Sequence, residues 1–241
     1  MILYVNGDSH AAAAECVNPH AWAKDDGFFW GLDRQPHPDN EKASFGCELA
    51  NWLFAVLYLD AQAGCSNARI MRTTREWIKL NPDAIKDTFM VIQWTTWERQ
   101  EWWHNGEDFQ VNASGIDDVP QELHDRYRKF IVDIDWEQCK RQAHEDIWQF
   151  HLELEEQGIR HVMFNGNSHF EGLEPFDWGN SYISPYSAKN TYDSILRQQG
   201  FKTVRPDSWH FGQDAHCFWG EYLLQYINNN QLLNTDEIPA D

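Results

Sequence analysis

A serine and a histidine near opposite ends of the chain are the first candidates for chemistry. Ser9 stands in the run "GDSH" (7–10), and His210 follows Asp207 by three positions in "RPDSWHFGQDAH". A serine hydroxyl attacks a carbonyl at neutral pH only when a neighbouring base takes its proton, and that base needs an acid that fixes its tautomer. Asp207 and His210 offer the acid and the base. The three residues predict acyl transfer through a covalent intermediate on Ser9.

Strands and helices must alternate along the chain if Ser9 and His210 are to meet. Apolar runs that end in polar turns predict strands at 2–5, at the end of 47–60, and at 88–94, 160–165 and 201–204. Helices are expected at 11–16, 66–80, 121–157 with a break near 132–136, 189–199 and 213–227. This order predicts an α/β fold, in which a five-stranded parallel sheet has helices on both faces and long loop insertions.

A single domain accounts for nearly all of the chain. The 241 residues are enough for one large α/β domain, which we expect over 1–230, followed by a polar tail at 231–241. Long loops are expected at 18–46, 95–120 and 166–187, because these stretches lack a sustained period and the first and last are rich in Gly and Pro.

The residues that follow the strands define where a ligand would bind. In open parallel sheets the ligand lies beyond the carboxyl ends of the strands. Polar residues follow the predicted strands there, namely Ser9, Gly64, the segment 95–99, Asn165, Asn167 and His210. We expect them to share one rim of the sheet.

Three sequence blocks resemble those of the SGNH (GDSL-type) hydrolase family: "VNGDSH", the glycine of "AQAGCSN" and "PDSWHFGQDAH". Members of that family are three-layer α/β/α esterases, lipases and carbohydrate acetylesterases with a flavodoxin-like sheet. The resemblance implies that Ser9 is the nucleophile, His210 the general base and Asp207 its orienting acid. It also implies that the backbone N–H groups of Ser9 and Gly64 form part of the oxyanion hole.

A third block departs from the family pattern. Where these enzymes usually have G-x-N-D, whose asparagine donates the third oxyanion hydrogen bond, this chain has "QWTTWER" (93–99). The loss of one such donor costs about 2.7–4 kcal/mol, which slows an enzyme without abolishing its activity. The Thr96 hydroxyl is the expected replacement, and the side chains of Asn165 and Asn167 are alternatives.

Aromatic residues cluster in the loops that leave this rim. Trp94, Trp97, Trp102 and Trp103 follow the third strand, and Trp178, Tyr182 and Tyr186 lie in the loop after the fourth. Flat rings suit sugar rings or acyl chains, so we expect Trp94 and Trp97 to bind substrate together with Arg99, Asn165 and Asn167. The other interpretation is that these rings pack the long loops onto the domain.

Charge and composition restrict the partners and the location. With 19 Lys+Arg against 38 Asp+Glu, the net charge of −19 repels nucleic acid and anionic membranes, and no run of about 18 apolar residues occurs. The five widely spaced cysteines indicate reduced thiols, and no signal sequence is evident, so a cytoplasmic or phage-particle location is expected. We expect no cofactor and no metal, because the histidines and acids lack the i, i+4 or short-loop clustering of a ligand set.

Two functional classes stay open. The first is a serine esterase that hydrolyses short-chain acyl esters, including O-acetyl esters of a small molecule or glycan, with O-acyl transfer as a variant. The second is a non-catalytic SGNH-like binding or structural module, including one of a phage particle. The activation state of Ser9 separates them. The acyl group, the alcohol and the oligomeric state do not follow from the sequence.

Overall fold

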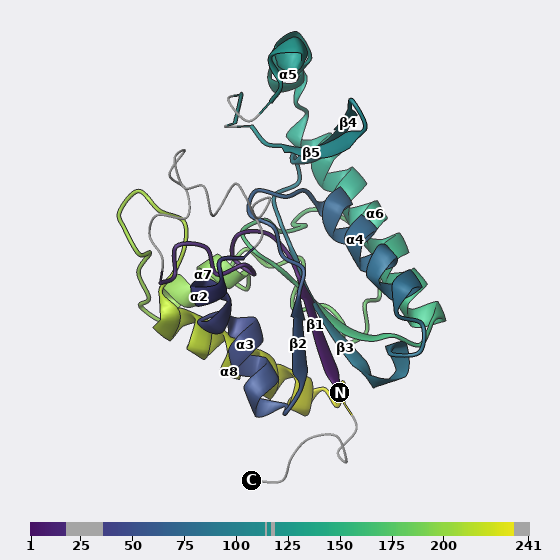
Figure 1. The fold of residues 1–241 in the computed structure, drawn as a ribbon, viewed down its shortest axis with the longest axis vertical. Helices are drawn as coiled ribbons and strands as arrows, with labels where there is room; N and C mark the ends of the chain where they lie inside the picture. Colours follow the sequence, from purple (N-terminus) through teal and green to yellow (C-terminus); the bar gives the residue numbers. More distant parts are fainter. Residues whose placement is uncertain (18–35, 114, 117–118, 234–241) are drawn as a thin grey trace.

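A parallel sheet of four strands forms the centre of the part of the chain that the structure describes. The structure is a computed structural model, described over residues 1–17, 36–113, 115–116 and 119–233. The strands are β1 (Ile2–Asn6), β2 (Val56–Leu59), β3 (Thr88–Trp94) and β6 (Arg160–Asn165), in the order β2-β1-β3-β6 (Figure 1). All neighbouring pairs are parallel, so the four carboxyl ends share one edge of the sheet.

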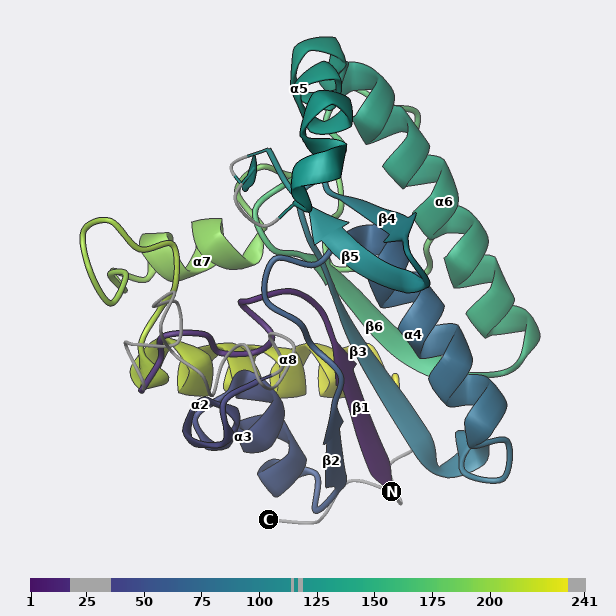
Figure 2. The same cartoon turned by 45° about the horizontal axis from the view of Figure 1, so that its top comes forward.

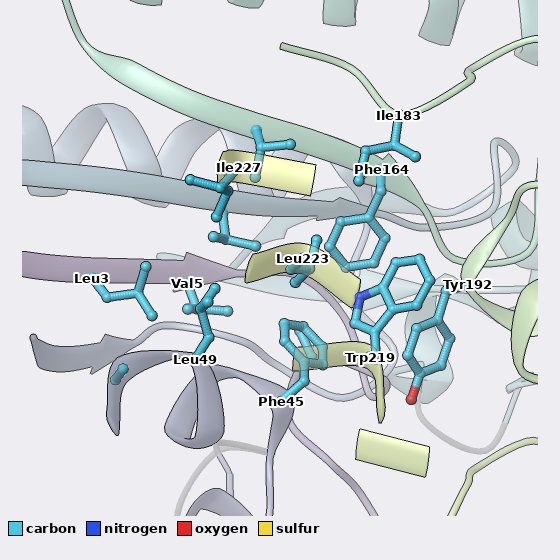
Figure 3. Close-up of a cluster of buried hydrophobic side chains, with 14 of the residues drawn as sticks. Leu3, Val5, Phe45, Leu49, Phe164, Ile183, Tyr192, Trp219, Leu223 and Ile227 are labelled. Carbon is cyan, nitrogen blue, oxygen red and sulfur yellow. The ribbon is translucent and has the colours of Figure 1, made fainter. Parts of the chain in front are cut away.

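The two faces of the sheet bury separate apolar clusters, because side chains alternate along each strand. Leu3 and Val5 pack with residues of α3 (Phe45–Trp52), α7 (Tyr192–Gln198) and α8 (Gln213–Asn229), as Figure 3 shows. Tyr4, Met90 and Ile92 face the opposite way, toward α4 (Asn67–Leu80) and α6 (Trp136–Glu156). The two helical groups lie on opposite sides of the sheet in Figure 1.

The helix boundaries follow local capping chemistry. The Ser66 hydroxyl caps α4 by accepting a hydrogen bond from the Arg69 N–H, and the Asp135 carboxylate caps α6 in the same way. The predicted break near 132–136 separates α5 (His124–Asp133) from α6. Gly158, with a φ of 65°, follows the end of α6 in the left-handed region that glycine tolerates.

The segment after β3 forms a small subdomain rather than an irregular loop. It contains the antiparallel hairpin β4 (Gln100–His104) and β5 (Glu107–Val111), a 3-10 turn at Gln121–Leu123, and then α5. Figure 2 shows this hairpin and α5 beyond the carboxyl edge of the main sheet. The remaining elements are α2 (Pro38–Lys42) and a 3-10 turn at Ile85–Asp87.

Two expectations from the sequence are wrong in the described residues. The alanine run at 11–16 forms consecutive turns instead of a helix. The predicted fifth strand at 201–204 contributes only an isolated antiparallel bridge between Thr203 and Phe211. The strand predicted at the end of 47–60 is present as β2, at the edge of the sheet, with Val56 71% exposed.

The predicted loop at 18–46 and the tail at 231–241 fall partly outside the description, which omits 18–35 and 234–241. Among the helices that are described, none is long and apolar enough to cross a membrane.

Candidate active site

The turn after β1 is built against the end of β3. A Cβ atom on Gly7 would lie 2.7 Å from the Cβ of Ala11 and 2.7 Å from Oε1 of Gln93, so only glycine fits there without movement. The same Gln93 oxygen accepts a hydrogen bond from the Asp8 N–H at 3.0 Å. Gln93, the first residue of the divergent third block, therefore positions the segment that carries Ser9.

Asp8 fixes this segment to the loop after β3. Its carboxylate accepts hydrogen bonds from the Thr95 hydroxyl at 2.6 Å and from Nη1 of Arg99 at 2.9 Å, and also from the His10 N–H. Burial alone would raise the pKa of the Asp8 carboxyl. The neighbouring His10 ring, the Arg99 guanidinium and these hydrogen bonds outweigh burial and lower that pKa to about 2. Asp8 is thus an ionised anchor beside Ser9.

The turns at 8–15 place Glu15 against the segment that contains His210. Ala13 and Glu15 have φ angles of 49° and 62°, in the left-handed region. That region costs a non-glycine residue about 1–2 kcal/mol, so other contacts must compensate. Those contacts are made by the Glu15 carboxylate, which lies buried among residues that come almost two hundred positions later.

Glu15 holds the imidazole of His210. Its Oε2 lies 2.6 Å from His210 Nδ1 and accepts a hydrogen bond from the Ser208 hydroxyl at 2.6 Å, while Oε1 pairs with Arg205. Burial would raise the pKa of Glu15, but the hydrogen bonds from His210 and Ser208 and the charges of His210 and Arg205 bring it below its usual range. A carboxylate on Nδ1 favours the tautomer that has its lone pair on Nε2.

Ser9 and His210 line one cavity of about 630 Å³ at the carboxyl edge of the sheet. Its walls bring together most of the predicted site residues, and they add several that were not predicted. The lining residues are Ser9, His10, Glu15, Gly64, Thr96, Glu98, Arg99, Asn112, Ala113, Asn167, Arg205, Asp207, Ser208, Trp209 and His210.

Two residues of the cavity lining, Ser9 and Gly64, have backbone N–H groups without a protein acceptor within the described residues. Gly64 has a φ of 76°, a conformation that a side chain would strain. Two unpaired N–H groups at a cavity wall are suited to bind an oxyanion.

Two predicted roles do not agree with the geometry. The Asp207 side chain is 82% exposed and pairs with Arg205, so Glu15, not Asp207, is the acid on His210. The single hydroxyl proton of Thr96 is donated to Glu98 at 3.1 Å, so Thr96 is not an available oxyanion donor. Asn167 lines the cavity and donates one amide hydrogen to His10 Nε2 at 3.3 Å, which leaves its second amide hydrogen for a ligand.

Three residues expected to bind substrate lie elsewhere in the fold. Trp94 is fully buried against Phe150, and Trp97 stacks on Phe170 with ring centroids 4.5 Å apart. The Asn165 amide donates to a backbone carbonyl and accepts from a tyrosine hydroxyl, both within the interior. These side chains pack the loops, which was the other interpretation of the aromatic residues. Trp102, Trp178 and Tyr182 are buried as well.

Several buried polar atoms of the cavity lining have no partner within the described residues. They are Nδ1 of His10, Oε2 of Glu98 and Nε of Arg99. Glu98 is 7% exposed, and Arg99 binds Asp8. Burial lowers the pKa of His10 to about 4, so its ring is neutral at pH 7. Each of these atoms has hydrogen-bonding capacity that no described residue uses.

Glu15, Glu98 and Trp209 are among the lining residues that sequence reasoning missed. Trp209 lies within the "PDSWHFGQDAH" block that was used for His210, and its ring is 68% exposed. Because Trp209 is next to His210 in the sequence, it could have been predicted to line the cavity. Glu15 carried no such signal, because nothing in its neighbourhood points to position 210.

His216, six residues after His210, has a structural role. It is buried in α8, and its Nδ1 accepts a hydrogen bond from the Phe45 N–H at 3.3 Å. Burial, together with the nearby His10 and His210 rings, lowers the pKa of His216 to about 3. Its neutral ring therefore caps the start of α3 from the core.

A possible metal-ligand cluster lies outside this cavity. His151, Glu155 and His161 place one ligand atom each within 4.8 Å of one another. The expectation of no metal overlooked that His151 and Glu155 are four residues apart on one helix. The cavity lining itself offers no such cluster among the described residues.

Comparisons with known proteins leave the geometry as the basis for a functional assignment. No protein-family model matches the chain, and no curated protein matches it significantly. The likeness to SGNH hydrolases rests on the motifs around Ser9, Gly64 and His210.

Proposed function

We propose that the protein is a serine esterase that cleaves short-chain acyl esters through an acyl-enzyme on Ser9. The observation that carries the proposal is the buried Glu15 carboxylate on Nδ1 of His210, in the same cavity as Ser9. A base oriented by an acid beside a serine is the arrangement that activates a hydroxyl nucleophile.

In the proposed reaction, Ser9 Oγ attacks the ester carbonyl and passes its proton to Nε2 of His210. The oxyanion of the tetrahedral intermediate accepts hydrogen bonds from the Ser9 and Gly64 N–H groups. Collapse breaks the ester bond, and His210 returns the proton to the leaving alcohol. Water then attacks the acyl-enzyme by the same route and releases the acid. Glu15 stabilises the imidazolium in both halves.

The third oxyanion donor in this proposal is the Asn167 amide rather than Thr96. Asn167 comes from the loop after β6, on the cavity wall, and has a second amide hydrogen that the His10 contact does not use. An Asn donor of this kind accounts for a factor of about 10² to 10³ in kcat.

The alcohol part of the substrate is proposed to carry several hydroxyl groups, as a sugar does. The unpaired Oε2 of Glu98 would accept a hydrogen bond from a hydroxyl, and the unpaired Nε of Arg99 would donate one. The exposed Trp209 ring at the same cavity offers an apolar face for a sugar ring.

The fold proposed with this function is the flavodoxin-like three-layer arrangement of SGNH hydrolases. The strand order β2-β1-β3-β6 corresponds to the first four strands of the 2-1-3-4-5 order of flavodoxin-like sheets. The proposal also includes the expected location, in the cytoplasm or in a phage particle. Its expected partner is a small-molecule or glycan ester, and no nucleic-acid partner is expected.

One observation favours the non-catalytic alternative. Among the described residues, the Ser9 hydroxyl makes no hydrogen bond with His210 or any other group, whereas a poised nucleophile usually contacts its base. Such contacts are often long in unliganded sites and tighten when substrate binds, so the esterase proposal still stands.

Intact-mass spectrometry after incubation with a fluorophosphonate tests the function. We expect one covalent adduct on the native chain, no adduct on Ser9→Ala, and an adduct on the control Ser168→Ala, a serine of the loop after β6 that does not line the cavity. No adduct on the folded native chain, or an adduct that survives Ser9→Ala, would favour the binding module.

A further inference from the structure

A second pair of histidines lies between α6 and β6, away from the cavity. His151 is on the second-last turn of α6, and His161 is the second residue of β6, whose carboxyl end at Asn165 leads to the cavity edge. The Nδ1 of His151 lies 2.9 Å from the Nε2 of His161, and both rings are buried. α6 covers the same side of the sheet as α4 (Figure 1).

The orientation of His161 is fixed by the backbone. Its Nδ1 lies 2.8 Å from the carbonyl oxygen of Ile159, and only a protonated Nδ1 can donate to that oxygen. Its Nε2 therefore carries a lone pair aimed at His151. Histidines that bind metals are usually held in this way, with the remote N–H donated to a carbonyl or a carboxylate.

Glu155 adds an anionic ligand from the solvent side. It follows His151 by one turn of α6, and its carboxylate belongs to the same cluster, in which every ligand atom lies within 4.8 Å of the others. Residues four apart lie on one face of a helix, so the two side chains reach the same point. The exposed carboxylate gives the buried imidazole pair an opening to solvent.

We propose that His151, Glu155 and His161 form a binding site for a divalent transition-metal ion of the Zn²⁺ type. Two imidazoles and one carboxylate are ligands that zinc accepts, and they leave a fourth position for water. With bonds of about 2.1 Å, tetrahedral ligands stand about 3.4 Å apart, so the two rings separate by about half an ångström when metal enters. His151 then moves its proton from Nδ1 to Nε2, and both facing nitrogens bind the ion.

The competing explanation is a hydrogen-bonded pair of histidines with no ligand. In that case Glu155 has no function in the cluster, and its removal changes nothing. The role of Glu155 is therefore the informative feature, and its exposure makes substitution safe for the fold.

The test is a titration of the metal-stripped full chain with Zn²⁺, followed by measurement of bound zinc after gel filtration. The variants are Glu155→Ala, the matched control Glu156→Ala, which removes an exposed carboxylate one residue away, and His151→Gln, whose amide can still donate to His161. Circular dichroism and the thermal unfolding midpoint verify that each variant is folded. Co²⁺ absorption spectra report the ligand type.

We expect one Zn²⁺ per native chain, an unchanged affinity in Glu156→Ala, and affinity at least about tenfold weaker in Glu155→Ala and His151→Gln. The proposal is overturned if no single equivalent binds, or if Glu156→Ala weakens binding as much as Glu155→Ala does, which would indicate diffuse attraction to the acidic surface. A Co²⁺ spectrum with thiolate charge-transfer bands would also overturn it, because the metal would then lie on cysteines.

Discussion

Two histidine pairs on different parts of this fold differ in what holds their rings. At the cavity, the His10 and His210 ring centroids are 5.4 Å apart, and Glu15 holds His210 through Nδ1. Between α6 and β6, His151 and His161 contact each other directly at 2.9 Å. The first pair opens onto a cavity of about 630 Å³, and the second is buried beside the exposed Glu155.

The difference shows that the group bound to Nδ1 of a histidine determines what its Nε2 can do. A carboxylate, as on His210, stabilises the protonated ring and so prepares it to take a proton. A carbonyl, as on His161, fixes a neutral tautomer without adding a negative charge, which suits a ligand for a cation. The same residue type is therefore proposed as a base in one region and as a metal ligand in the other.

The largest expected effect comes from removing the proposed base. We expect His210→Ala to reduce kcat/KM for a short-chain aryl ester by about 10⁴-fold or more, because the serine loses its proton acceptor. The control is His169→Ala, a histidine on the loop after β6 that does not line the cavity, and its kcat/KM should match the native value. Equal activity of both variants would remove His210 from the reaction.

Acidification should weaken the cavity side of the fold. Burial lowers the pKa of His10 to about 4 and that of His216 to about 3, whereas an unfolded histidine titrates near its ordinary value. Below pH ~6.5 the unfolded chain binds protons that the folded chain does not, so stability falls as the pH falls from ~6.5 towards 4.

Each of these histidines should contribute a loss of about 1.4 kcal/mol per pH unit over that range. Urea unfolding at a series of pH values measures the slope. In His216→Gln, whose amide oxygen can still accept from the Phe45 N–H, the slope should be smaller by about that amount. An unchanged slope would mean that His216 is protonated in the folded chain.

A smaller effect is expected at the cavity mouth. If a sugar ring lies on Trp209, then Trp209→Ala should raise KM for an acylated sugar by about three- to tenfold with little change in kcat, since a ring contact contributes about 0.5–1.5 kcal/mol. Trp103→Ala removes an equally exposed ring outside the cavity and should leave KM unchanged. A rise in KM for both variants would indicate a general surface effect.

The sequence predicted the central strands well, because their signal is local. The runs 88–94 and 160–165 coincide with β3 and β6. Both strands are buried almost throughout, and each has an unbroken apolar stretch, Phe89 to Ile92 in β3 and Val162 to Phe164 in β6. The alanine run at 11–16 has a strong local signal for a helix, but it is not helical. Long-range contacts of Glu15 decide its conformation, and propensity does not contain them.

The candidate site, like the fold, was predictable from the sequence only where its signal is local. Ser9, Gly64 and His210 were found because each follows or precedes a strand in a recognisable block. The acid of the site was assigned to Asp207 on its spacing to His210, yet the chain direction after residue 206 turns that carboxylate outward to Arg205. The pair His151 and Glu155 was visible in the sequence at helical spacing, whereas its partner His161 required the packing of α6 on β6.

The rate of fluorophosphonate labelling in Glu15→Gln and Asp207→Asn tests the central claim most directly. If the buried Glu15 carboxylate orients His210, Glu15→Gln should slow labelling of Ser9 by about 10³ to 10⁴-fold, while Asp207→Asn stays within about threefold of the native rate. If instead Asp207→Asn loses labelling and a folded Glu15→Gln retains it, the acid, and with it this account of the site, is wrong.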